Sequence, residues 1–100
     1  MTEAEWNSLS TFSQLSNIAG DVKRCVDSRR NFLLGVAQKD YSNFYFEKIT
    51  KLVCMMVQKE ENVSRQKEFF DELDELKRFL NNEVDGEYIM HYWDPFTKLN

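Results

Sequence analysis

Residues 10–38 read STFSQLSNIAGDVKRCVDSRRNFLLGVAQ, the longest stretch of the chain with the periodicity of a helix. Its first apolar side chains recur at steps of three and four residues, which is the spacing of one helical face. This set comprises Phe12, Leu15, Ala19, Val22 and Val26. Continuing the helix returns three more apolar residues to this face or beside it: Leu33, Val36 and Ala37. The pattern therefore predicts one long helix from about Ser10 to about Gln38.

Two glycines, Gly20 and Gly35, lie within this stretch, and each costs about 1 kcal/mol in a helix interior. Gly35 can instead mark a break, in which case residues 31–38 form a hydrophobic loop. We prefer the long helix, which Thr11 and Gln14 can begin with a capping box.

Arg29 falls on the apolar face of this helix, between Val26 and Leu33. A buried and unpaired guanidinium would be too costly, so its charge must be compensated. Its stem can pack while the head reaches water, or it can pair with a carboxylate from another helix. We prefer the first account.

A second helix is expected from about Asp40, a good N-cap residue, to about Lys59. Its apolar residues cover more than half of the circumference, with Phe44 and Met55 at one margin. Such a helix is covered on more than one side. The extra cover is either a partner, for example a second copy of the chain, or the aromatic C-terminal tail. The pattern leaves both alternatives open.

A third helix is expected from about Ser64 to about Val84, with a clean apolar face. That face comprises Phe69, Leu73, Leu76, Leu80 and Val84. The stretch 87–93 is long enough for two further helical turns, which Asp94-Pro95 should end because the residue before Pro avoids the α conformation. The sequence thus predicts an all-α fold with one domain over residues 1–100. We expect an antiparallel three-helix bundle closed by a short C-terminal fourth helix or aromatic tail.

Composition narrows the classes of function. The net charge is −4, and residues 61–100 carry ten acids against five bases. Because nucleic-acid binding depends on clustered Lys and Arg, we do not expect a nucleic-acid partner. Neither a signal peptide nor an apolar run of about 20 residues is visible, so we expect no membrane partner. Two Cys without an export signal suggest reduced thiols and a cytoplasmic location. Cys54 falls in the polar strip of the second helix.

Catalytic and metal chemistry find little support. A single His excludes the paired Glu-x-x-His motifs of a bundle di-iron site, and a structural zinc site needs four Cys or His ligands. Glu87 and His91 can share a helical turn, but two ligands do not make a selective site. The acidic run DELDELK, residues 71–77, is interpreted as a solvated helix face. We therefore predict no catalytic residue, no metal and no cofactor.

Two resemblances arise. QLSNIAGDVKR at 14–24, FEKITKL at 46–52, the acidic third helix and the aromatic tail resemble small prokaryotic helical-bundle proteins without an assigned function. Arg30-Asn31 resembles the opening of the HEPN motif, in which His follows Arg after four to six residues. Gly35 stands where that His could be, so this resemblance implies an inactive member of the HEPN group.

The favoured hypothesis is a small cytosolic interaction module, acting as a regulator, inhibitor or subunit and associating with another protein or with itself as a homo-oligomer. Its expected contact surface joins the second helix to the tail and comprises Phe44, Met55, Tyr88, Ile89, Tyr92, Trp93 and Phe96. In the tail, these rings form either a lid on the bundle or a dimer seam. One alternative is a nucleic-acid- or nucleotide-processing enzyme that uses Arg29, Arg30 and His91. Another is a small-ligand binder with an aromatic pocket between the tail and the second helix.

Overall fold

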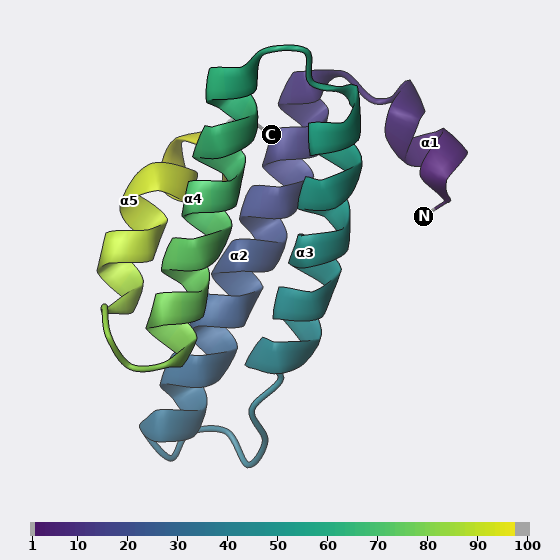
Figure 1. Cartoon of the computed structure of the whole chain (residues 1–100). Helices are drawn as coiled ribbons and strands as arrows, with labels where there is room; N and C mark the ends of the chain where they lie inside the picture. Colours follow the sequence, from purple (N-terminus) through teal and green to yellow (C-terminus); the bar gives the residue numbers. More distant parts are fainter. Residues whose placement is uncertain (1, 98–100) are drawn as a thin grey trace.

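The computed structural model describes residues 2–97, which form five helices and, within that range, no strand (Figure 1). The helices are α1 (Glu3–Ser8), α2 (Thr11–Leu33), α3 (Ser42–Lys59), α4 (Val63–Leu80) and α5 (Gly86–Thr97). The prediction of an all-α fold is confirmed. The helix packing is compatible with a bundle, in which α2 packs against α3 and α5, and α4 packs against the same two helices.

The predicted apolar face of α2 supplies the centre of the core. Ala19, Val22 and Val26 are completely buried, together with Ile18 and Cys25 from the flanks of that face. The helix begins one residue earlier than the expected capping box, because the Ser10 hydroxyl accepts a hydrogen bond from the Ser13 amide. The predicted partner Gln14 instead donates its side-chain amide to the carbonyl of Trp6.

The expectation that α2 continues to about Gln38 is wrong, because the helix ends at Leu33. Gly35 has φ +75°, a left-handed conformation that favours glycine and ends helices. The amides of Val36 and Ala37 both donate to the carbonyl of Asn31, which satisfies the helix end. The break at Gly35, the less preferred alternative, is therefore observed, although residues 31–33 of the expected hydrophobic loop belong to the helix.

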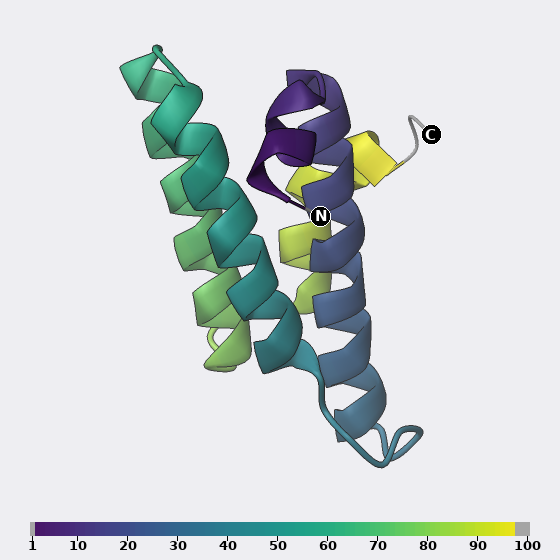
Figure 2. The same ribbon diagram turned by 90° about the vertical axis from the view of Figure 1, so that its right-hand side faces the viewer.

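A short helix, α1, was not predicted from the sequence. Figure 2 shows α1 in front of the first turns of α2, and its Trp6 is buried in the core. The C-terminal tail was one of the two expected covers for α3, but α5 packs mainly on α2 and α4. The signal for α1 was present, since Thr2 and Glu5 have the spacing of a capping box and Thr2 caps the helix.

α4 and α5 also differ from their predicted limits. α4 ends at Leu80 rather than near Val84, and Asn82 adopts a left-handed φ of 62° in the turn. α5 continues through Pro95 to Thr97, so the expected end at Asp94-Pro95 is wrong. The ring of Phe96 packs 6.0 Å from that of Trp93, and Ser16 donates a hydrogen bond to the carbonyl of Phe96. These contacts with the core and with α2 keep the last turn helical.

Candidate interaction surface

The end of α2 exposes a continuous apolar segment. All six residues from 31 to 36 are exposed, and four of the six are large and apolar. The exposed fractions are 43% for Phe32, 63% for Leu33, 74% for Leu34 and 76% for Val36. We name these four residues the apolar tip. Single exposed apolar residues are ordinary, whereas a run of this kind on the surface of a folded domain indicates a functional surface.

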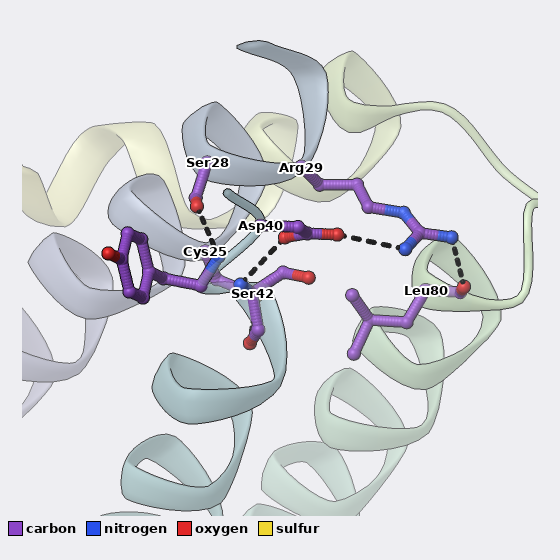
Figure 3. Close-up of polar contacts among 7 residues, drawn as sticks. Cys25, Ser28, Arg29, Asp40, Ser42 and Leu80 are labelled. Carbon is purple, nitrogen blue, oxygen red and sulfur yellow. Dashed lines mark hydrogen bonds and ion pairs between the residues drawn. The ribbon is translucent and has the colours of Figure 1, made fainter. Parts of the chain in front are cut away.

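Polar contacts pin the loop that carries the tip (Figure 3). The guanidinium of Arg29 donates from Nη1 to Asp40 Oδ2 and from Nη2 to the carbonyl of Leu80, each at 3.0 Å. The Ser28 hydroxyl accepts from the amide of Tyr41 at 2.8 Å. The α3 end of the loop is thus held to α2, and α2 is held to the end of α4. At the other end of the loop, the amides of Val36 and Ala37 donate to the carbonyl of Asn31, so the loop that carries the apolar tip is anchored at both ends.

This arrangement corrects the preferred account of Arg29. Its head group does not reach water alone: it is paired, and its carboxylate partner Asp40 lies in the α2–α3 loop rather than on another helix. Burial raises the pKa of Asp40, but hydrogen bonds from Ser42 and Arg29 outweigh it and hold that pKa below its usual range. The ion pair is therefore intact throughout the neutral range.

The two cysteines lie in different environments. Cys25 is completely buried and donates its thiol to the carbonyl of Ser42. Burial raises the pKa of Cys25 to about 12, and the nearby Asp40 carboxylate adds to the effect. Cys54 is exposed, and neither thiol forms a disulfide. The buried thiol is consequently a packing group, not a nucleophile.

A groove of about 610 Å³ lies beside the apolar tip, between the end of α2 and the turn from α4 to α5. We name it the end groove. Its apolar lining comes from Leu33, Phe79 and Val84. Arg29 and Arg30 line the α2 side, while the opposite side carries three carboxylates: Glu83, Asp85 and Glu87. The end groove thus combines an apolar lining with charges of both signs.

The structure distributes the predicted contact residues over several environments. Ile89 and Trp93 are buried in the core, whereas Phe44 on α3 and Tyr88 on α5 are more than half exposed. Met55, Tyr92 and Phe96 are partly buried against the core. In this chain, α5 is therefore a lid on α2 and α4.

Tyr92 and Phe96 also line a cavity of about 590 Å³ with Phe12, Leu15 and Phe69. The Tyr92 hydroxyl donates to Glu68 at 2.6 Å at its edge. This aromatic cavity lies between α2, α4 and α5, so its walls differ from the predicted pocket, which was to involve the second helix of the bundle. It is large enough for a small organic molecule.

The three polar candidates do not line one cavity. Arg29 and Arg30 line the end groove, while His91 lines a separate cavity of about 680 Å³ with Tyr88, Tyr92 and four carboxylates. Those carboxylates belong to Glu72, Glu75, Asp85 and Glu87. Burial, followed by the negative charges of Glu75, Glu68 and Asp71, raises the pKa of Glu72 to about 7. Among residues 2–97, no group of three or more His, Cys, Asp or Glu is arranged to hold a metal ion.

Comparisons with models of known protein families, with curated proteins and with solved structures found no match. In the described part of the chain, no helix has the length and apolar character required to cross a membrane.

Proposed function

We propose that this chain is a small protein-interaction module whose principal contact surface is the apolar tip. The observation that carries the proposal is the run of exposed apolar side chains at residues 32–36. Exposed apolar surface is removed from water when a partner covers it, which favours association by roughly 25 cal/mol per Å² buried. The proposed contact surface thereby moves from the second helix and the tail, as expected from the sequence, to the end of α2.

Rigidity supports this choice of surface. A preorganised contact surface loses less conformational entropy on binding than a flexible one. The contact of Arg29 with Asp40 and the hydrogen bonds from the Val36 and Ala37 amides to Asn31 anchor the two ends of the loop that carries the tip. In the proposed architecture, three antiparallel helices closed by α5 form the scaffold. Two thiols outside any disulfide support a cytosolic setting.

The proposal is tested with a photoreactive amino acid placed at position 36 or at position 63, followed by irradiation of the source cell. Val36 and Val63 are both 76% exposed and lie at opposite ends of the bundle, so position 63 is a matched control. We expect covalent adducts of defined mass from position 36 and few from position 63. Equal adduct formation at the two positions, or none at either, would contradict an interaction role for the tip.

A second candidate function is the binding of a small aromatic or apolar ligand in the cavity lined by Phe12, Phe69 and Phe96. The favouring observation is that Phe12 is 54% exposed at the rim, where a ligand could cover it. Native mass spectrometry of the purified protein tests this function. An added mass that disappears in Phe12→Ser would support a ligand site, and an unmodified mass would argue against one.

A further inference from the structure

We propose that the partner of the apolar tip is a second copy of this chain, in a twofold dimer where each tip enters the end groove of the other copy. This inference rests on the proposed interaction function and names its occupant. A twofold interface requires one self-complementary surface that contains both the inserting and the receiving parts. The tip and the end groove meet this requirement because Leu33 belongs to both.

The end groove, like the apolar tip, presents apolar side chains. Phe79, Val84 and Leu33 give the end groove an apolar lining, next to the exposed side chains of Leu34 and Val36. The left-handed turn at Gly35 directs the chain away from the helix at this point. Entry of a partner's tip would therefore bury apolar side chains on both sides of the contact.

The distribution of charge around the end groove favours a second copy of the chain over an unrelated protein as the partner. Arg30 and Lys39 flank the tip, and Glu83, Asp85 and Glu87 lie across the end groove. Within residues 2–97, none of these five side chains forms an ion pair. In the proposed dimer, the cations of one copy pair with the carboxylates of the other. A partner of one charge sign would complement only one side of the end groove.

The area of the contact surface determines how tightly the two copies are expected to associate. Stable interfaces bury about 1,200–2,000 Å² in total, and four exposed side chains supply only part of that area. The charged rim must contribute the rest, and contacts between exposed charges weaken as salt screens them. We therefore expect a reversible dimer whose dissociation constant rises with ionic strength.

Sedimentation equilibrium of the full chain tests this inference, at concentrations from about 1 μM to about 1 mM and at low and high salt. The variants are Val36→Glu, which places a charge on the tip, and Val63→Glu, its matched control at an equally exposed site. Circular dichroism confirms that each variant folds. We expect dimers for the wild type and for Val63→Glu, and at least a tenfold weaker association for Val36→Glu.

The charged rim is tested separately with Lys39→Glu, Glu87→Lys and the double variant. Each single change should weaken the dimer, and the double variant, which restores opposite charges across the seam, should recover part of the loss. A wild type that stays monomeric over the whole range overturns the second-copy inference. If it still forms position-36 adducts of a different mass, the interaction function survives. If it forms none, both proposals fail.

Discussion

The Arg29 guanidinium and the Asp40 carboxylate meet at 3.0 Å across the turn that joins α2 to α3. Only about a fifth of the Arg29 side chain and 15% of the Asp40 side chain are exposed, so water screens the pair only in part. Asp40 also accepts the amide of Ser42 in the first turn of α3. One carboxylate therefore holds the α3 end of the α2–α3 loop to α2 and accepts a hydrogen bond in the first turn of the next helix.

Replacing Asp40 with Ala should lower the free energy of unfolding by about 2 kcal/mol, since it removes a helix-start hydrogen bond and leaves Arg29 without its carboxylate. Asp27→Ala is the control, because it breaks the exposed pair with Lys23 and should change stability by less than about 0.5 kcal/mol. Urea unfolding measures both. Equal losses in the two variants would show that the Arg29–Asp40 pair has no special role.

The ionisation of Asp40 predicts that the stability of the fold depends on pH in the acidic range. Its pKa is lowered in the folded chain, so its contribution is complete above the unfolded value of about 3.9 and is lost as pH falls through the folded value. The stability difference between the wild type and Asp40→Asn should be constant from pH 7 to pH 5 and shrink below about pH 4. A difference that persists unchanged in acid would contradict the assigned ionisation.

Glu72 predicts the opposite dependence of folding stability on pH. Burial, followed by the charges of Glu75, Glu68 and Asp71, raises its pKa to about 7, above the unfolded value of about 4.3. The folded state therefore holds a proton that the unfolded state has lost, and stability should fall as pH rises from about 4.3 to about 7. Glu72→Gln should flatten that slope in thermal unfolding curves, while Asp74→Asn, at an exposed site on the same helix, should not.

Much of the fold follows from periodicity, because burial of one face repeats every three to four residues in a helix. This reasoning found the buried positions Ala19, Val22 and Val26, and it separated the exposed Cys54 from the core. It overextended α2 because Leu33 and Val36 match the same face, while only the backbone conformation of Gly35 shows that the helix has ended. An apolar residue's position on a helical projection does not reveal whether another element covers it.

The tail shows a second limit of local rules. The residue before Pro avoids the α conformation in an isolated helix, yet Asp94 and Pro95 remain helical since Phe96 packs beside Trp93. Such a tertiary contact cannot be inferred from neighbouring residues. The candidate surface was harder still to predict. Exposure of the segment 31–36 depends on where other helices stop, and the sequence pattern favoured the second helix and the tail instead.

Substitutions in the tail should therefore affect stability according to whether the side chain is buried or exposed. Trp93→Ala should lower the free energy of unfolding by about 3–5 kcal/mol, because the side chain is almost fully buried. Tyr88→Ala, on the same helix but 54% exposed, should change it by about 0.5 kcal/mol or less. Chemical denaturation of the two variants checks this, and a small effect at Trp93 would mean that α5 is not part of the core.

The thiols provide a probe of the folded state without any mutation. Cys54 is exposed and should react with a thiol reagent within minutes, while Cys25 is buried with a pKa raised to about 12 and should react only on unfolding. Counting modified thiols by mass spectrometry in buffer and in denaturant gives the comparison. Two thiols reacting at the same rate in buffer would contradict the packing of Cys25 between α2 and α3.

Carbene footprinting of the wild-type protein at rising concentration tests most directly whether the apolar tip and the end groove form a contact between two copies. The method reports which side chains lose contact with water. Residues 32–36 and the exposed side chains of Glu83, Asp85 and Glu87 should be labelled strongly in dilute solution and become protected together as the concentration rises. Val63, which is equally exposed at the opposite end, should keep its labelling throughout. Protection that is absent from the apolar tip, or that appears equally at Val63, would contradict the account.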